Sequence, residues 1–475
     1  MFSASMGYPE KSGKVFSSPR KGKSNYLTMK SFSDEKMNGV LLISPFARRT
    51  TRYVPVGLLG IATYLEKQGI PASIVDMKHR LGLGSVLAKF IRGQSHDSFR
   101  MMEEYYDNVF YAIGKLRPKM VGIPCYTGEY SSVMELGRRI KGRYDTYLVA
   151  GGVHATLRPD EFIFEGSPFD FAIVGDGEKP LAKLYRALDE KDRGYKTLTG
   201  VCYFDAASKT IMKNPCYIEE DLSIFPVPDY SKIDMDFYTR PHIHNIRWLL
   251  LSGVGIFTAR GCPYKCTFCA TNYLRSLNKE AAKVRYRPID QVICEIEMLK
   301  KDYKIDCFYI QDDCFMLSEE RTTEFCEKLL HKKLNLIWGA ETRVTYLKNE
   351  KLLQLMKKTG LVQFDVGVES GSSAMLKEIK KEISVESIKN AFDLCKKLGI
   401  RIFANVMYNL PNEREEDVRA TNDLLNVLNP SAIGASITVP LLGTEIYEKY
   451  VNPKLHKDEY DMYNDGVYEK VIDSI

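Results

Sequence analysis

The chain has 475 residues, of which 44% are hydrophobic and 27% charged, and its formal net charge is +6. This balance is typical of globular proteins and excludes disordered, collagen-like and fibrous chains. The length predicts two to four domains. So small a basic excess does not indicate a nucleic-acid partner.

The sequence has no run of about 18 consecutive apolar residues, so we expect no transmembrane helix. Its first residues lack the apolar segment of a signal peptide. Eleven cysteines, an odd number, then favour reduced thiols over a disulfide framework. We therefore expect a cytoplasmic protein in which some cysteines are metal ligands.

The sequence pattern divides the chain into five parts. They are a disordered tail (1–36), a first α/β domain (37–190), a connector (191–247), a second α/β domain (248–450) and a C-terminal tail (451–475). The first tail is rich in Ser, Lys and Gly and has few aliphatic residues, which is typical of a disordered segment. The connector has only short strand-like runs, and we expect it to pack between the two domains.

In the first domain, apolar runs alternate with segments of helical periodicity. The predicted strands are VLLISPF, PASIVDM, KMVGIPCY, TYLVAGG and FAIVGDG, and the predicted helices span 55–67, 131–141 and 179–188. This alternation indicates a parallel, doubly wound sheet of Rossmann or flavodoxin type. Glycines at the carboxyl ends of the strands indicate places where the backbone approaches a ligand closely.

The second domain repeats the alternation six times. Its predicted strands are VGIFTAR, DCFYIQDD, LIWGAET, VQFDVGVE, IRIFANVMY and AIGASITV, with helices at 289–301, 319–331, 349–359, 385–398 and 415–428. Six such units predict a partial, TIM-type (β/α)6 barrel, and barrels of this kind carry their chemistry at the carboxyl ends of the strands.

The most specific motif is ARGCPYKCTFCAT, which follows the first barrel strand. Cys262, Cys266 and Cys269 form a C-x3-C-x2-C pattern. Three thiolates on one short loop can bind three irons of a [4Fe–4S] cluster and leave the fourth iron open. A structural zinc site needs a fourth ligand, but the next cysteine, Cys294, falls in a predicted helix.

This motif, with Arg260 and Gly261 before it and Phe268 inside it, resembles that of the radical SAM superfamily. The resemblance implies that the open iron binds S-adenosylmethionine (SAM) and that an electron from the cluster cleaves SAM to a 5′-deoxyadenosyl radical. It also implies that Phe268 lies beside the adenine.

Three further residues at strand ends fit this resemblance as SAM-binding residues. Glu369, in VGVESGS, resembles the family's carboxylate near the methionine amine of SAM, and a carboxylate there can pair with an ammonium. Arg343, in AETRV, could bind a carboxylate bidentately. Asp312, followed by Asp313 in FYIQDDCF, matches a pattern common in the superfamily. The alternative for each acid is a helix cap or a solvated loop carboxylate. No catalytic residue is assigned.

The first domain carries a second resemblance, to the cobalamin (B12)-binding subgroup of radical SAM proteins. It rests on PVGLLGIATYLEKQG, VAGGVHATLRPDEF, IVGDGEKPL and the connector segment DLSIFPVPDY. The candidate cobalamin-binding residues, all after strand ends, are Tyr126, Thr127, Gly151, Gly152, His154, Gly175, Gly177 and Glu178. The chain has no D-x-H-x-x-G motif, so no His is expected to ligate cobalt from below. Alternatively, the domain packs without binding a corrinoid, and His154 is a loop hydrogen-bonding residue.

These resemblances imply a cobalamin-dependent methyltransferase that acts on an unactivated carbon of a small-molecule or natural-product substrate. The first alternative is a radical SAM oxidoreductase, dehydratase or cyclase, with cobalamin assisting or absent. A non-catalytic cluster or corrinoid sensor is a minor alternative. A tRNA-methylthiolating enzyme is disfavoured because the sequence lacks a second three-cysteine motif. The chemistry requires an electron donor such as flavodoxin or ferredoxin, which could dock on basic residues around the cluster, Lys265 among them.

Overall fold

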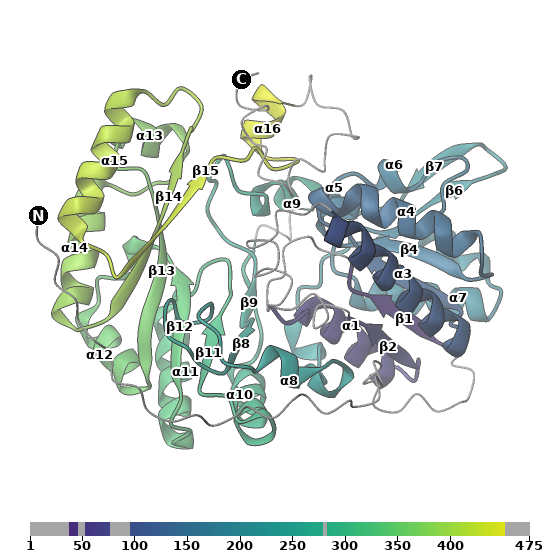
Figure 1. Cartoon of the computed structure of the whole chain (residues 1–475), viewed down its shortest axis with the longest axis horizontal. Helices are drawn as coiled ribbons and strands as arrows, with labels where there is room; N and C mark the ends of the chain where they lie inside the picture. Colours follow the sequence, from purple (N-terminus) through teal and green to yellow (C-terminus); the bar gives the residue numbers. More distant parts are fainter. Residues whose placement is uncertain (1–37, 46–52, 77–95, 279–282, 452–475) are drawn as a thin grey trace, which may run out of the picture. The chain divides into compact units, whose positions relative to one another are not determined.

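The computed structural model describes residues 38–45, 53–76, 96–278 and 283–451. The predicted tail 1–36, and all but the first residue of the predicted tail 451–475, lie outside these ranges. Two large, mainly parallel sheets form, one built on each predicted domain, and both belong to one compact unit of the chain, Asp34–Ile475 (Figure 1).

The first sheet has the strand order β2-β1-β3-β4-β5-β6-β7. Its strands are β1 (Val40–Ile43), β2 (Ala72–Val75), β3 (Met120–Pro124), β4 (Tyr147–Gly151), β5 (Phe171–Ile173), β6 (Val201–Asp205) and β7 (Thr210–Lys213). The first five are parallel, in the order of a flavodoxin-type sheet. The predicted doubly wound domain is therefore confirmed.

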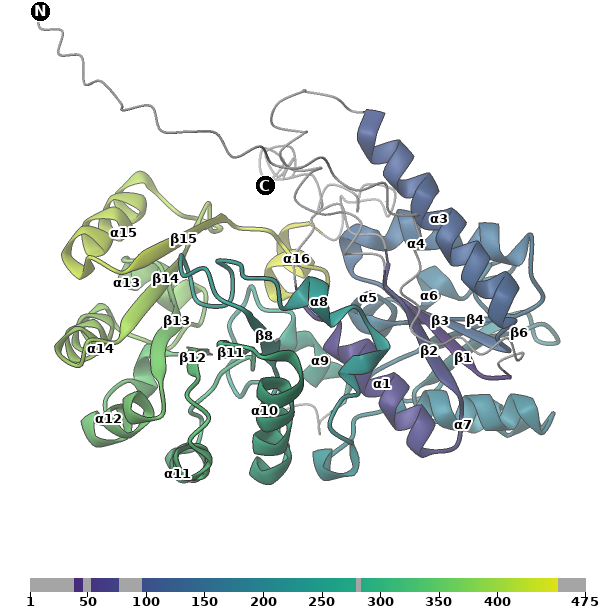
Figure 2. The ribbon, with the colours of Figure 1, turned by 60° about the horizontal axis from the view of Figure 1, so that its bottom comes forward.

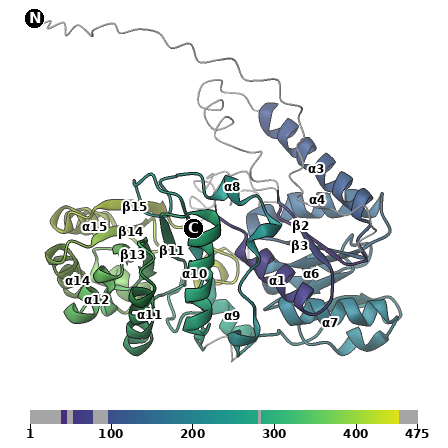
Figure 3. The ribbon, with the colours of Figure 1, turned by 90° about the horizontal axis from the view of Figure 1, so that it is seen from below.

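Helices cover both faces of this sheet, which is why its strands are continuous apolar runs. The helices are α1 (Val56–Lys67), α3 (His96–Leu116), α4 (Tyr130–Lys141), α5 (Gly152–Leu157), α6 (Pro159–Phe162) and α7 (Glu178–Asp189). Helices α1 and α7 pack together on one face. Helices α3 and α4 lie on the other face, where Arg139 binds Glu103 at 3.0 Å (Figure 3).

The first part of the predicted connector (191–247) is not a linker but continues the first sheet. Strands β6 and β7 are antiparallel to their neighbours and extend the first sheet to Lys213. The remainder is built from short turns: η4 (Leu222–Ile224), η5 (Tyr230–Lys232) and α8 (Met235–Tyr238). Tyr230 is buried here, and its hydroxyl donates to Glu295 of the barrel at 2.6 Å. The connector is thus anchored to both domains.

The second sheet has the order β15-β14-β13-β12-β11-β8, with all strands parallel. Its strands are β8 (Gly253–Ile256), β11 (Cys307–Ile310), β12 (Ile337–Thr342), β13 (Leu361–Glu369), β14 (Arg401–Tyr408) and β15 (Ala432–Ile437). The short strands β9 (Ala259–Arg260) and β10 (Arg285–Tyr286) pair separately. Six parallel strands confirm the predicted partial barrel.

The barrel helices follow the outer side of this curved sheet (Figure 2). They are α10 (Ile289–Tyr303), α11 (Glu319–Lys332), α12 (Glu350–Lys358), α14 (Val385–Lys397) and α15 (Glu415–Leu428), with shorter helices α9 (Thr271–Leu277), α13 (Ser373–Glu378) and α16 (Glu445–Tyr450). No helix of the described ranges is both long and apolar enough to cross a membrane.

The strands bury alternate side chains under these helices. Trp338 of β12 is fully buried and stacks on Phe308 of β11 at 5.8 Å between ring centroids. The same apolar core continues through the connector to α1 and the first sheet. A rigid core beneath both sheets fixes the strand ends from which the candidate site residues project.

Candidate functional site

The three-cysteine loop leaves the barrel directly after β9, and two adjacent aspartates after β11 hold it. Asp312 accepts hydrogen bonds from the backbone N–H groups of Thr258 at 2.6 Å and Ala259 at 3.1 Å. Asp313 accepts one from the N–H of Gly261 at 3.1 Å. The carboxylates therefore fix the backbone that leads into Cys262.

Asp312 is 2% exposed, and burial raises its pKa to about 6 against the opposing hydrogen bonds from Thr258 and Ala259. The sequence resemblance made Asp312 a SAM-binding residue. In the structure its oxygens are engaged by the loop, so its support of any ligand is indirect.

The cysteines lie on one tight loop in a form that suits a cluster. Cys266 is buried, Cys262 and Cys269 are partly exposed, and the N–H of Cys269 donates to the carbonyl of Cys266 at 3.2 Å. Within the described ranges, no three His, Cys, Asp or Glu side chains converge as ligands of a single metal ion would. A [4Fe–4S] cube is bound at separate irons, so its cysteines need not converge on one point. The donor set therefore fits a cluster.

Arg343, just after β12, lies against this loop. Its Nη1 is 3.7 Å from the sulfur of Cys266, and its guanidinium lies 3.5 Å from the ring centre of Tyr264. Its Nε is buried and has no hydrogen-bond partner among the described residues. An unsatisfied buried donor is costly, and a guanidinium edge is suited to a carboxylate. Arg343 thus fits the carboxylate of a ligand bound beside the cluster.

Glu369 ends β13 in the left-handed backbone region, at φ 63°. Its Oε1 lies 2.6 Å from Nζ of Lys381, and both residues are buried. A Cβ at Gly367 would lie 2.2 Å from Oε1 of Glu369, so a larger residue there would displace this carboxylate. The pair is held beside Phe268, whose ring centre is 5.9 Å from Nζ of Lys381.

The structure therefore brings together Cys266, Phe268, Arg343 and Glu369, as the sequence predicted, and adds Lys381. Lys381 lies in the segment KEIKKEI, and nothing in that pattern separates it from its exposed neighbours. Its ammonium marks a position at which Glu369 binds a cation.

Glu341 is a second residue that the sequence analysis missed. Trp338 and Ala340 of β12 are buried under the helices, so Glu341 projects into the barrel, where it is paired in register with Asp365 of β13. Burial and the charge of Asp365 raise the pKa of Glu341 to about 7, although solvent reaches the residue. The alternation along IWGAET could have identified this position, since it places Glu341 on the same face as Arg343.

The candidate corrinoid loops of the first domain differ in how open they are. Tyr126, after β3, is 66% exposed, with Thr127 next to it partly buried. A Cβ on Gly151, after β4, would meet no atom within 4 Å. Gly152 has φ 80° and packs on the backbone of Cys125. The open positions fit a large ligand above these strand ends.

His154 is fully buried and has partners for both ring nitrogens. Nδ1 lies 3.1 Å from the hydroxyl of Thr127, and Nε2 lies 2.9 Å from Glu161. Its ring also stacks on Tyr130 at 5.1 Å. The structure therefore favours the alternative reading, in which His154 supports the loop that carries Thr127.

The loop after β5 faces the connector and the barrel. A Cβ on Gly175 would lie 1.9 Å from the carbonyl oxygen of Tyr217, so this glycine allows a backbone approach by the connector. Gly177, in the same loop, packs against Ile61 of α1. The sequence predicted that a ligand approaches these two glycines closely. In the structure, other parts of the chain occupy that space.

Arg260 binds two carboxylates of that loop. Its Nη1 lies 2.9 Å from Asp176 and its Nη2 lies 2.6 Å from Glu178, which is 3% exposed. Arg285 also binds Asp176. Arg260 directly precedes Gly261 and Cys262, so this ion-pair network, the Arg260 clasp, ties the β5–α7 loop to the cysteine loop. Glu178 was a candidate corrinoid contact, but in the structure its carboxylate binds Arg260.

Replacing Glu369 with Gln should weaken the affinity for SAM by at least about tenfold, because a charged hydrogen bond to the ligand's ammonium would contribute roughly 1.5–3 kcal/mol. Glu341→Gln is the matched control, since it removes a carboxylate from the adjacent barrel strand. Equilibrium binding of SAM to both reconstituted variants tests this. Equal affinities for the two variants would remove the proposed role of Glu369.

Glu341 should make stability depend on pH. A carboxyl whose pKa is raised on folding stabilises the fold below its unfolded pKa, about 4.5, and this contribution is lost as pH rises through about 7. Glu341→Gln should therefore gain melting temperature relative to the parent between pH 5 and pH 8. Thermal unfolding across this range measures the difference, and a constant difference would contradict the raised pKa.

The Arg260 clasp should appear as energetic coupling between the two domains. In a double-mutant cycle of Arg260→Met and Glu178→Gln, we expect a coupling of about 1–3 kcal/mol, as for residues that share one ion pair. Urea unfolding followed by tryptophan fluorescence gives the four stabilities. Additive effects of the two substitutions would mean that the pair does not join the domains.

Two family models match this chain in the order of its two sheets. The B12 binding domain matches residues 46–185 and the Radical SAM superfamily matches residues 256–425. The anaerobic magnesium-protoporphyrin IX monomethyl ester cyclase of Rubrivivax gelatinosus is 28% identical over 75% of this chain, and the chain spans only 63% of that relative's length. The cytidylyl-2-hydroxyethylphosphonate methyltransferase of Streptomyces wedmorensis is 24% identical, with 89% of this chain and 84% of the relative covered.

A solved structure agrees in fold. The radical SAM methyltransferase TsrM of Kitasatospora setae, with cobalamin and a [4Fe–4S] cluster bound, superposes with a TM-score of 0.69 at 18% identity, over 88% of this chain and 78% of that one. A radical SAM domain implies a [4Fe–4S] cluster and SAM as cofactors, and a B12 binding domain implies cobalamin. The chain therefore carries a B12-binding domain followed by a radical SAM domain.

Proposed function

We propose that this chain is a cobalamin-dependent methyltransferase that adds a methyl group to an unactivated carbon of a small-molecule or natural-product substrate. When bound, the cluster supplies the electron that cleaves SAM, and the corrinoid supplies the methyl group. The observation that carries the proposal is the Arg260 clasp. It holds a loop of the B12-type domain against Arg260, two residues before Cys262, so both cofactors would serve one substrate.

The residues of the chain have separate parts in this proposal. Cys262, Cys266 and Cys269 would hold the cluster, and Asp312 and Asp313 keep their loop in place. Their hydrogen bonds need no rearrangement when a ligand enters.

SAM would lie between the cysteine loop and the barrel interior. Arg343 would bind the carboxylate of its methionine part through the free Nε, and Glu369 would bind the ammonium beside Lys381. Phe268 would flank the adenine. Glu341, open to the barrel interior, would accept a hydrogen bond from the substrate and exchange a proton with it near neutral pH.

Corrinoid contacts would come from the open strand ends, at Tyr126, Thr127, Gly151 and Gly152, while His154 and Glu178 support the loops. We further propose a cytoplasmic location, because none of the eleven cysteines forms a disulfide, and cysteines outside disulfides are typical of a reducing compartment.

A second candidate keeps the radical initiator and changes the product. The cyclase of Rubrivivax gelatinosus is similar over three quarters of this chain. A radical SAM oxidoreductase, dehydratase or cyclase, with cobalamin assisting or absent, would use the same cysteine loop and the same SAM residues. It differs in forming no methylated product.

The test begins with anaerobic reconstitution of the full chain with iron, sulfide and hydroxocobalamin, followed by desalting and metal analysis. We expect about four irons and one cobalt per chain. With SAM, a chemical reductant and a small-molecule extract of the source cell, a product carrying one added methyl group should form, together with 5′-deoxyadenosine and S-adenosylhomocysteine. Iron without cobalt, or turnover without methylation, would favour the second candidate.

Cys266→Ala should lose the cluster and all cleavage of SAM, because the remaining two thiolates cannot hold three irons. Cys294→Ala is the matched control, since Cys294 is exposed and lies outside the loop. Iron content and 5′-deoxyadenosine formation are measured on both. Cleavage retained in Cys266→Ala would refute the ligand assignment.

A further inference from the structure

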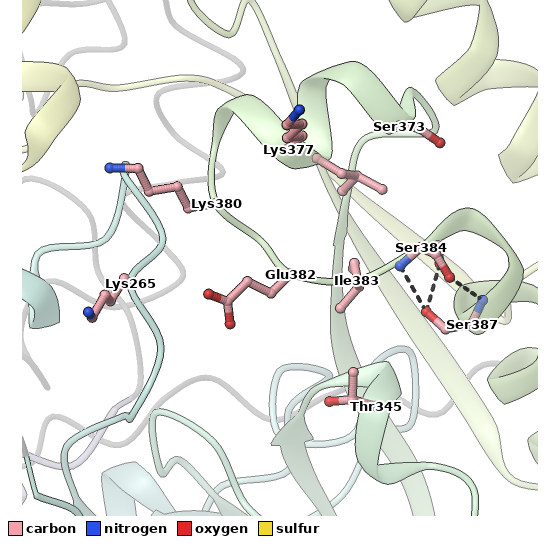
Figure 4. Close-up of a pocket in the computed structure, with 10 residues that line it drawn as sticks. Lys265, Thr345, Ser373, Lys377, Lys380, Glu382, Ile383, Ser384 and Ser387 are labelled. Atoms are coloured by element: carbon pink, nitrogen blue, oxygen red, sulfur yellow. Dashed lines mark hydrogen bonds between the residues drawn. The ribbon is translucent and has the colours of Figure 1, made fainter.

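A basic hollow lies on the surface next to the cysteine loop. Its volume is about 590 Å³, and it is open to solvent. The residues that line it are Lys265, Thr345, Ser373, Leu376, Lys377, Lys380, Glu382, Ile383, Ser384 and Ser387. In Figure 4, Lys265 and Lys380 lie on one side and Ser384 and Ser387 on the other.

The wall of this hollow touches the residues around Cys266. Lys265 is the neighbour of Cys266 in sequence. On the other side of that cysteine, the N–H of Thr267 donates to the carbonyl of Ile379 at 3.1 Å. Arg343, 3.7 Å from the sulfur of Cys266, donates to the carbonyl of Lys381. One layer of backbone therefore separates the hollow from a cluster ligand.

Alternate side chains of that layer point in opposite directions. Lys381 is buried and binds Glu369 inside the barrel at 2.6 Å. Lys380 and Glu382, on either side of it, are exposed and line the hollow, and both have positive φ, 51° and 54°. The segment thus divides an interior face, where SAM would lie, from an exterior face that SAM does not need.

The exterior face carries an excess of positive charge. Three lysines line the hollow against one glutamate. Lys265 and Lys377 are exposed and form no ion pair with another described residue, whereas Lys380 binds Glu445 at 2.6 Å. Unpaired surface cations attract an acidic surface over about 10 Å at ordinary salt concentration. The hollow is open to solvent, and its serines can offer hydroxyl groups to a protruding loop of a protein partner.

We infer that this hollow is the docking surface of an acidic one-electron donor protein, with flavodoxin as the donor class. One electron would pass from the reduced flavin of the donor to the cluster that Cys262, Cys266 and Cys269 would hold, and no group or proton would be transferred. The inference rests on the proposed radical SAM function and adds the partner and its place. Electrostatic complementarity of this kind acts on encounter and orientation more than on the chemistry that follows.

The test compares two matched pairs of lysines in the full reconstituted chain. The first variant is Lys377→Glu/Lys380→Glu, at the hollow. The control is Lys396→Glu/Lys397→Glu, at the opposite end of α14. Each pair contains one lysine that binds a glutamate: Lys380 binds Glu445 at the hollow, and Lys397 binds Glu350 in the control. The other lysine of each pair, Lys377 or Lys396, is exposed and forms no ion pair with a described residue. A third variant, Lys265→Ala, removes the charge nearest the cluster.

Binding of a purified acidic flavodoxin is measured first, by biolayer interferometry at two salt concentrations. We expect about tenfold weaker binding for the hollow variant than for the parent and the control, with the difference reduced at high salt. Lys265→Ala should weaken binding in the same direction. No measurable binding to the parent, or equal loss in the control, would overturn the inference.

Cleavage of SAM is then driven by reduced flavodoxin or by two chemical reductants of opposite charge, dithionite and reduced methyl viologen. The hollow variant should be slower with flavodoxin and unchanged with both chemical reductants. Loss with all three would mean that the lysines support the cluster or SAM instead of a donor. Failure of the parent with the chemical reductants would refute the proposed function itself, which separates the two failures.

Discussion

The contact of Arg260 with Asp176 and Glu178 is the interaction on which the two-domain arrangement of the site depends. It joins the last residue of β9 to the loop after β5, and Arg285 and the connector carbonyl of Glu219 complete it. Because Glu178 is buried, loss of its cation would leave a charge without solvent or partner, which is a costly state. The cysteine loop is consequently fixed to the first domain and to the barrel at once.

Inside the barrel, too, buried carboxylates are paired with cations or hydrogen-bond donors. Lys381 neutralises Glu369 and Arg247 neutralises Asp365, whereas Asp312 accepts three hydrogen bonds from neutral donors of Thr258 and Ala259. The Nε of Arg343 and the carboxylate of Glu341 are not paired in this way. Within the part of the chain that the structure describes, neither has a partner, and both lie where ligands are expected.

Much of the fold was predictable because strands buried on both faces leave a clear pattern. The run LIWGAET predicted β12 within one residue, and the helix expected at 415–428 is α15 as observed. The strands β6 and β7 were assigned to the connector because both are short and antiparallel at the edge of the first sheet, and β7 is mostly exposed, so its apolar signal is weak.

The candidate site was predictable where a motif specifies the chemistry and not where packing does. The spacing of Cys262, Cys266 and Cys269 needs no structure to be recognised. Glu178 binds Arg260, 82 residues away, and both ring nitrogens of His154 bind side chains that only the folded loops bring to them, so strand-end position alone assigned both residues to a ligand. Lys381 could not be predicted as a site residue for the same reason, since only the folded chain distinguishes it from the exposed lysines around it.

Gly367 has no reactive group, yet its position tolerates substitution as poorly as that of a residue that binds a ligand. The space above its Cα is already filled by the carboxylate of Glu369 and the ammonium of Lys381. Any larger residue would displace both charged groups, although Gly367 itself offers no atom to a ligand. A survey of inactive variants of this protein would therefore group Gly367 with its functional neighbours, and loss of activity alone would not distinguish a filled space from a lost contact.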